Sequence, residues 1–268
     1  MNKKTYDRIV ELHEEYKNVH ELLRSEFGVV EKDMIELAYD LQAGSYIENT
    51  KKKPEYYEKI SSEISEIINK YKPDSILEAG CGELTTLHGI QTNAEKYGFD
   101  ISYKRIATGI QYGLAKRENV FVADLYNIPL EDNSVSIVYT MHSIESNSKG
   151  VESILYELYR VASDYLILFE PSNEISDENG KREIDRKGYC KDLIYKCNSL
   201  FGDVETLELK NVYNPLNKTV AIIIEKGHRN SKFKLCCPIT KQPINESPYG
   251  YPYINGIKIL DHRKAVYL

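Results

Sequence analysis

Long hydrophobic runs are absent from this 268-residue sequence. No apolar stretch approaches the ~20 residues that a membrane-spanning helix needs, so we expect no contact with a membrane. The opening segment, MNKKTYDRIVELHEEY, also lacks the apolar core and the small-residue cleavage site of a signal peptide. We therefore expect a cytoplasmic protein.

Paired cysteines and an excess of positive charge are also missing. The five cysteines are odd in number and form no Cys-x-x-Cys pair, which favours reduced thiols. Acidic residues outnumber basic ones by 41 to 35, and the net charge is −6. Because phosphate contacts dominate affinity for nucleic acid, a dedicated nucleic-acid-binding protein would carry a basic face. The composition therefore argues against a nucleic-acid partner.

The segment before residue 74 is predicted to be an N-terminal helical extension or cap, residues 1–73. Apolar and aromatic residues recur there at three- and four-residue steps over three stretches: Tyr6–Phe27, Met34–Leu41 and Tyr57–Tyr71. His13 and His20 share one face of the first stretch, and we interpret them as packing residues rather than metal ligands.

From residue 74 the pattern changes to alternating strands and helices. The predicted strands are Ser75–Ala79, Tyr97–Asp100, Val120–Ala123, Val135–Met141, Tyr165–Glu170, Glu205–Val212 and Val220–Lys226. The predicted helices lie near Thr85–Lys96, Lys104–Lys116, Val151–Val161 and Tyr189–Phe201, and the stretch between residues 171 and 188 is polar. This alternation indicates an α/β domain over residues 74–227, with a mostly parallel sheet and helices on both faces.

After a linker at residues 228–232, residues 233–268 are predicted to form a small β-rich tail. Short β-like pieces such as Gly256–Leu260 stand among Pro, Tyr and Gly. So short a segment cannot easily stabilise itself. We therefore expect five apolar side chains to pack against the main domain: Tyr251, Tyr253, Ile254, Ile257 and Ile259.

The strongest chemical signal is a glycine-rich turn in the run Ile76-Leu-Glu-Ala-Gly-Cys-Gly-Glu-Leu-Thr85. Gly80 and Gly82 stand between an apolar strand and a helix, where they allow a tight turn and close approach of the backbone to a ligand. Asp100 ends the next strand, where its carboxylate can accept hydrogen bonds from both ribose hydroxyls of a nucleoside cofactor. Asp124 ends the third strand and can accept from an adenine amino group.

In this order, these motifs resemble the class I S-adenosylmethionine-dependent methyltransferases over about residues 75–226. Ile128-Pro-Leu, Asp132-Asn-Ser and His142-Ser-Ile-Glu145 match further motifs of that family, whereas Leu84 and Ser136 stand where many members have Gly and Asp. The resemblance implies a Rossmann-like fold and S-adenosyl-L-methionine as cofactor. It predicts cofactor contacts from Glu78, Gly80, Cys81, Gly82, Asp100, Ile101, Asp124, Leu125, Tyr139, Tyr39 and Tyr46.

Two alternatives bear on the cofactor pocket. A nicotinamide-dependent dehydrogenase would need glycine at position 85, where this chain has Thr85. Tyr39 and Tyr46 either cover the methionine part of the cofactor or the acceptor, as N-terminal segments do in such enzymes, or pack a helix end on the core. Cys81 is a familiar residue of this turn and need not be a nucleophile.

The methyl acceptor is predicted to lie at the carboxyl ends of the parallel strands. The side chains there are polar, aromatic and acidic, without an adjacent Arg or Lys: Tyr139, His142, Glu145 and Glu170. They favour a hydroxyl or basic nitrogen on a small metabolite, such as a sugar or nucleotide-sugar, with His142 as base or orienting group. Alternatively, the two glutamates only cap the following helix or loop.

The tail resembles a small zinc-ribbon-like module that some methyltransferases carry or recruit. Thr240 stands where its second cysteine would be, and Cys236, Cys237 and His262 do not supply four ligands at sensible spacing. We therefore expect no metal. Two other function classes stay open: an RNA or protein methyltransferase that holds its substrate with the tail, and a non-catalytic cofactor-binding partner protein. A homo-oligomer is compatible with the sequence.

Overall fold

The computed structural model describes residues 1–17, 19, 22–212, 214, 216–228 and 231–268. Its N-terminal part is helical: α1 (Lys3–Tyr16), α2 (Leu23–Phe27), α3 (Lys32–Leu41), α4 (Ser45–Lys52) and α5 (Pro54–Asn69). The single helix expected over Tyr6–Phe27 is wrong, because α1 ends at Tyr16 and the next residue, Lys17, has a positive φ. His20, and residues 229 and 230 of the predicted linker, lie outside the described residues.

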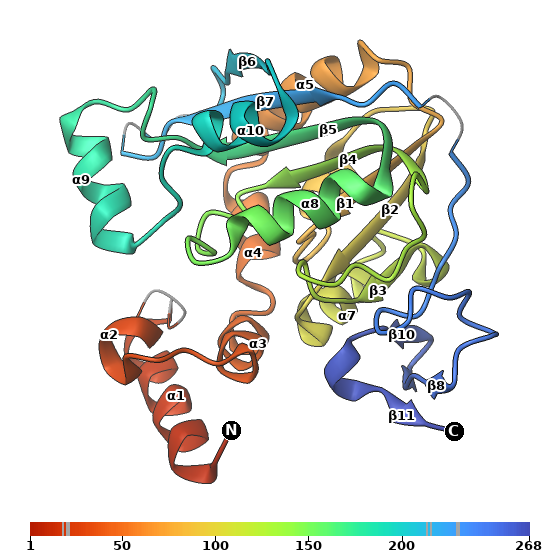
Figure 1. Cartoon of the computed structure of the whole chain (residues 1–268). Coiled ribbons are helices and arrows are strands. Elements are labelled where there is room, and N and C mark those ends of the chain that lie inside the picture. The colour runs from red at the N-terminus through yellow and green to blue at the C-terminus, as the bar shows by residue number, and fades with distance from the viewer. Residues whose placement is uncertain (18, 20–21, 213, 215, 229–230) are drawn as a thin grey trace.

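The sheet has the order β6-β7-β5-β4-β1-β2-β3-β10-β9. Its strands are β1 (Ser75–Ala79), β2 (Glu95–Asp100), β3 (Val120–Val122), β4 (Val135–Met141), β5 (Ala162–Pro171), β6 (Glu205–Glu208), β7 (Thr219–Glu225), β9 (Tyr253–Ile254) and β10 (Ile257–Ile259). Strands β1 to β5 pair in parallel, while β7 is antiparallel to both β5 and β6. The expected mixed α/β, Rossmann-like fold is therefore confirmed (Figure 1).

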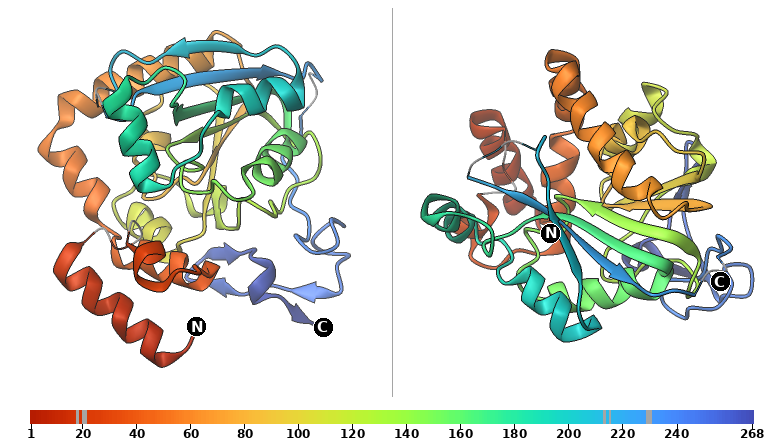
Figure 2. Two further views of the ribbon diagram at one scale, coloured as in Figure 1. Left: turned by 60° about the vertical axis from the view of Figure 1, so that its left-hand side comes forward. Right: turned by 90° about the horizontal axis from the view of Figure 1, so that it is seen from above.

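Helices cover both faces of this sheet (Figure 2, right). One core lies between the sheet and α8 (Val151–Val161) with α10 (Leu193–Phe201). The other lies between the sheet and α5, α6 (Thr85–Gly89) and α7 (Tyr103–Gln111). Alternate side chains of a strand point to opposite faces, so Val138 joins the first core and Tyr139 the second.

Two helices differ from the prediction. The helix expected over Thr85–Lys96 ends at Gly89, because Ser65 and Asn69 of α5 hydrogen-bond the extended backbone at Gln91. The polar stretch before residue 188 contains α9 (Glu178–Lys187), which only buries Gly180 and Ile184. Its apolar stripe is too sparse for periodicity to reveal, although Asp177 caps its start and Gly188 its end.

The first helices of the chain have a small core of their own. Its buried members are Ile9, Leu12, Val19, Leu23, Met34 and Ala38. Among the described residues, none of these side chains belongs to either of the two cores of the sheet. Helices α1 to α3 therefore pack on one another rather than on the sheet.

The C-terminal tail extends the main sheet. Strand β10 pairs in parallel with β3, and Ile257 and Ile259 are buried as expected. The same expectation is wrong for Tyr253 and Ile254, which are 65% and 43% exposed, because β9 forms the outer edge of the sheet. Strand β8 (Tyr249–Gly250), which precedes β9, pairs with β11 (Val266–Tyr267) in a separate small sheet. None of the described helices has the length and apolar character needed to cross a membrane.

Candidate cofactor and acceptor site

The glycine-rich turn follows β1 and closes against β2. The N–H groups of Gly80 and Cys81 both donate to the carbonyl oxygen of Phe99, at 2.8 and 2.9 Å. Gly80 and Gly82 have φ values of 78° and 50°. A Cβ on Gly80 would lie 2.4 Å from the Cβ of Ser143, so the turn requires glycine there for space as well as for conformation.

Asp100 joins this turn to the start of α7. Its carboxylate accepts the N–H of Gly82 through Oδ2 and the N–H of Ser102 through Oδ1, each at 2.8 Å. The side chain is 6% exposed. A carboxylate has about four lone-pair positions, so Asp100 can accept further hydrogen bonds while it holds the turn.

Arg105 is a site residue that the sequence analysis missed. It belongs to α7 and is buried with its guanidinium beside the glycine turn, where a Cβ on Gly82 would lie 2.3 Å from Arg105 Nη2. The guanidinium lies over the rings of Tyr39 and Tyr46. The distances from Arg105 Cζ to the two ring centroids are 5.4 and 4.8 Å. The structure therefore brings both predicted tyrosines to the glycine turn through a cation–π contact.

A second missed residue is Glu83, which is 1% exposed. Its Oε2 accepts the N–H of Ile47 at 2.9 Å, and its Oε1 lies 3.9 Å from Arg105 Nε without a hydrogen-bond partner. Helix α7 comes this close because of Gly109, where a Cβ would lie 2.5 Å from the carbonyl oxygen of Glu83. A glycine inside a predicted helix was the available signal for close packing of α7 on the turn.

Asp124 lies beyond the end of β3 and is buried. Its Oδ2 forms an ion pair with Lys32 of α3, and its Oδ1 accepts the N–H of Tyr126 at 3.0 Å. Ile101 and Leu125, which follow the two aspartates, are partly buried. The three N-terminal residues Lys32, Tyr39 and Tyr46 thus all reach the carboxyl ends of the strands.

Glu78, Cys81 and Tyr139 lie deeper than expected. The hydroxyl of Tyr139 donates to Glu78 Oε2 at 3.2 Å, and its fully buried ring contacts Phe169. This position inside the core argues against the catalytic role expected for Tyr139. Burial raises the pKa of Glu78 to about 8 and raises that of Cys81 well above its ordinary value, so the thiol stays protonated and is a poor nucleophile.

His142 follows β4 in a left-handed conformation, with a φ of 50°. Its N–H donates to the carbonyl oxygen of Phe169 at 3.1 Å, and its Nε2 lies 2.7 Å from Thr219 Oγ1 of β7. Burial lowers the pKa of His142 to about 4, and the nearby Lys187 ammonium of α9 adds to this effect. The imidazole is therefore neutral at pH 7.

Glu170 is the residue before the last of β5 and lies near Glu145. Its Oε1 accepts the N–H groups of Ser143 and Ile144, at 3.0 and 3.3 Å, so it does cap the loop after β4, as one alternative predicts. Burial raises its pKa to about 7 against these hydrogen bonds. Burial also raises the pKa of Glu145 to about 8, and the charge of Glu170 adds to it. In both glutamates, Oε2 is buried without a hydrogen-bond partner.

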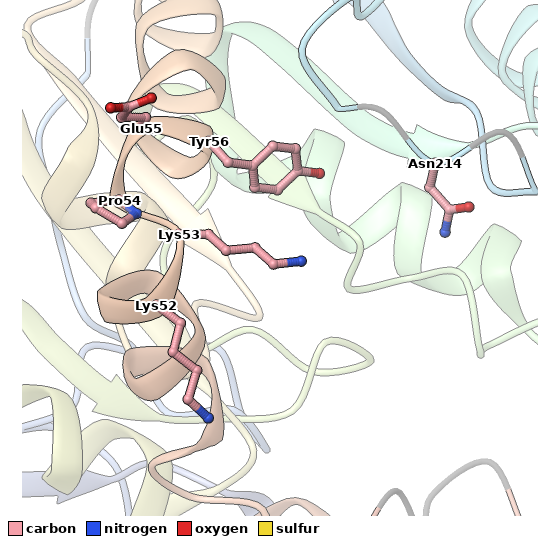
Figure 3. A pocket seen from close by; sticks show the side chains of 6 residues that line it. All are labelled: Lys52, Lys53, Pro54, Glu55, Tyr56 and Asn214. Carbon is pink, nitrogen blue, oxygen red and sulfur yellow. The ribbon is translucent and has the colours of Figure 1, made fainter.

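Two surface hollows lie away from this site. One of about 690 Å³ opens where α4 meets α5 and is lined by Lys52, Lys53, Pro54, Glu55, Tyr56 and Asn214 (Figure 3). None of these residues belongs to the predicted site. At that site, Lys32 of α3 pairs with Asp124, and the rings of Tyr39 of α3 and Tyr46 of α4 lie against Arg105.

Comparisons with known proteins agree with this architecture. Residues 77–165 match the family model described as methyltransferase domain. Magnesium protoporphyrin IX methyltransferase of Synechocystis PCC 6803, solved with bound S-adenosylhomocysteine, is 14% identical with a TM-score of 0.52, over 82% of this chain and 100% of that one. This similarity extends over the whole of the Synechocystis chain and shows a shared fold.

Two further solved structures are S-adenosylmethionine-dependent methyltransferases. The protein of Thermotoga maritima is 15% identical with a TM-score of 0.47, over 68% of this chain and 97% of that one. The protein of Methanosarcina mazei is 15% identical with a TM-score of 0.47, over 60% of this chain and 97% of that one. No curated protein matches the chain by sequence. The match over residues 77–165 and the fold shared with the Synechocystis enzyme together indicate a methyltransferase domain with the class I fold in this chain.

Proposed function

We propose that this methyltransferase acts on an oxygen or nitrogen atom of a small metabolite, such as a sugar or nucleotide-sugar. The observation that carries the proposal is the pair Glu145 and Glu170, each with one buried, unpartnered carboxyl oxygen. Leaving a buried acceptor unpaired costs about 1–3 kcal/mol. A bound acceptor that offers O–H or N–H donors would remove this cost.

The residues of the turn fit the cofactor. Gly80 and Gly82 present backbone without side chains, and Asp100 keeps lone pairs for ribose hydroxyls while Gly82 and Ser102 hold it in place. Asp124 is proposed to accept the adenine amino group. When bound, S-adenosylmethionine supplies an already activated methyl group, so the work of the protein is alignment and exclusion of water.

Arg105 is proposed to hold the carboxylate of the methionine part. Its guanidinium is buried between the glycine turn and the rings of Tyr39 and Tyr46, and its Nε has no hydrogen-bond partner. A guanidinium pairs well with a carboxylate because it offers two parallel N–H donors. In this proposal the two tyrosines cover the cofactor from the N-terminal side.

The two candidate bases differ in pKa. General bases work best when their pKa lies near the working pH, and the pKa of Glu170 is about 7 whereas that of His142 is about 4. We therefore propose that His142, held by Thr219, orients the acceptor. Glu170 or Glu145 takes a proton at Oε2 when the acceptor is a hydroxyl. A neutral amine needs only a site that keeps it oriented.

A screen of acceptors with labelled S-adenosylmethionine tests this proposal. On an acceptor so found, we expect His142→Ala and Glu170→Gln to lower the rate of transfer at least tenfold, with unchanged affinity for S-adenosylhomocysteine. Glu152→Gln, on the exposed side of α8, is the matched control. Full rates in both site variants would remove these residues from the acceptor site. Methylation of RNA and of no small molecule would overturn the substrate class.

A further inference from the structure

Helix α3 connects the two aspartates of the cofactor site. Lys32 at its start pairs with Asp124. Asp40 near its end accepts the Ser102 hydroxyl at 2.5 Å and the Lys104 N–H at 3.2 Å. Because Ser102 in turn donates its N–H to Asp100, one helix braces both ends of the proposed cofactor pocket.

Polar contacts, rather than a shared apolar core, hold α3 in this place. The apolar cluster around α3 draws its buried members from Ile9–Ala38 and, among the described residues, none from the sheet. Ion pairs and hydrogen bonds depend on geometry more than apolar packing does. Any residue from another part of the chain that forms ion pairs with α3 therefore influences where Lys32 and Asp40 lie.

The C-terminal tail contacts α3 in this way through Arg263. Its Nη1 lies 2.6 Å from Asp33 Oδ1, and its Nη2 lies 2.9 Å from Glu36 Oε2. Residues 33, 36 and 40 follow the three- and four-residue steps of one helix face, so Arg263 contacts the same face of α3 that carries Asp40. The left view of Figure 2 shows the tail beside the N-terminal helices.

Arg263 is itself anchored to the sheet next to the cofactor site. The buried carboxylate of Asp261 accepts the backbone N–H of Arg263 at 2.9 Å and its Nε at 3.0 Å. One residue earlier, Leu260 donates its N–H to the carbonyl oxygen of Val122, at 2.8 Å, in strand β3. Asp124 follows that strand, so the strand that carries Asp124 also carries the anchor of Arg263.

We propose that Arg263 is a positioning residue for the cofactor. Its ion pairs with α3 hold Lys32 and Asp40 at the adenine and ribose ends of the pocket. The inference rests on the proposed cofactor contacts and does not depend on the identity of the acceptor. It assigns the tail a function within the chain, namely to fix the N-terminal helices over the cofactor.

Calorimetry with S-adenosylhomocysteine tests the role of Arg263. We expect Arg263→Ala to raise the Kd roughly tenfold, which corresponds to the loss of about one strong charge-assisted contact. The matched control is Arg8→Ala, which breaks an ion pair with Glu26 inside the N-terminal helices and leaves the tail contact intact. Wild type that binds no S-adenosylhomocysteine would refute the cofactor site itself. If wild type binds S-adenosylhomocysteine, two results would overturn only the role of Arg263. One is an equal or lower Kd for Arg263→Ala than for wild type, and the other is an equal loss of affinity in Arg8→Ala.

Two readouts separate positioning from simple unfolding of the tail. Hydrogen exchange of Arg263→Ala should accelerate in α3 and stay unchanged in β10. The double variant Asp33→Asn with Glu36→Gln keeps Arg263 and the tail but removes the two charged partners of Arg263 on α3, so it should raise the Kd about as much as Arg263→Ala does. If β10 also loses protection in Arg263→Ala, this double variant decides: a raised Kd supports the proposal, and an unchanged Kd overturns it.

Discussion

At the scale of single residues, Leu84 and His142 are among the described residues other than glycine that have a positive φ, which costs roughly 1–2 kcal/mol per residue. Leu84, with a φ of 66°, stands where many methyltransferases have a third glycine. Burial of its side chain in the core beside α6 offsets that strain. His142, with a φ of 50°, is held by its contacts to Phe169 and Thr219. Strain that the surroundings maintain is typical of functional positions.

Asp100 carries the first prediction at this scale. Replacing it by Ala removes the proposed ribose acceptor, and hydrogen bonds to a carboxylate contribute about 1.5–3 kcal/mol. We therefore expect Asp100→Ala to weaken binding of S-adenosylhomocysteine at least roughly tenfold in calorimetry. Asp100→Asn keeps one acceptor oxygen for the turn and serves as the comparison. An unchanged Kd in the Ala variant would show that Asp100 only supports the loop.

Glu170 carries the second prediction, which concerns pH. Its pKa is about 7 in the folded chain against an ordinary 4.5, so between these values the folded state binds more protons than the unfolded state. Stability therefore falls as the pH rises through this window. We therefore compare the free energy of unfolding of Glu170→Gln with that of wild type at two pH values. This difference should shift in favour of the variant by on the order of 1–3 kcal/mol between pH 4 and pH 8. Urea unfolding at both pH values measures the difference, and a constant difference would contradict the prediction.

At the scale of elements, α7 determines how the proposed cofactor site is closed. Its cap residue Ser102 contacts both Asp100 and Asp40, and its first turn delivers Arg105 to the glycine turn. Gly109, one helical turn later, lets the whole helix approach Glu83. The position of this one helix therefore sets the distances among residues from α3, β2 and the glycine turn.

Gly109→Ala tests that close approach. Helix propensity alone would make the substitution stabilising by about 1 kcal/mol. The added Cβ would lie 2.5 Å from the Glu83 carbonyl oxygen, so we expect a net loss of about 2 kcal/mol instead. Thermal unfolding distinguishes the two expectations, because the melting temperature rises if helix propensity dominates and falls if the close contact dominates. A higher melting temperature for the variant would mean that α7 does not pack on the turn this tightly.

At the scale of the whole molecule, helix α3 and the C-terminal tail contact each other beside the proposed cofactor site. The tail continues the sheet at β3, while Arg263 joins it to α3. The sulfur of Cys237 lies 3.0 Å from the Tyr251 hydroxyl and accepts the Thr240 N–H at 3.4 Å. These two contacts surround a thiol where a ribbon-like module would place a metal.

We expect the purified protein to contain no structural zinc. Among the described residues, no group of three or more His, Cys, Asp or Glu side chains is arranged to hold a metal ion. The tail draws its stability from β10 and the burial of Ile257 and Ile259. Elemental analysis should therefore find less than stoichiometric zinc, and chelators should leave the melting temperature unchanged. Zinc at one equivalent would contradict this expectation.

Periodicity and turn chemistry in the sequence alone determined the sheet and the glycine turn, because strands β1 and β4 and the residues Gly80 and Gly82 follow from local pattern. The end of α6 at Gly89 did not, since contacts from α5 impose it. Only the tertiary structure brought Arg105, Glu83 and Lys32 to the proposed cofactor site and buried Tyr139 against Glu78 and Phe169. The physical reason is that burial, ion pairs and close helix packing join residues far apart in the chain, which spacing along the sequence cannot encode.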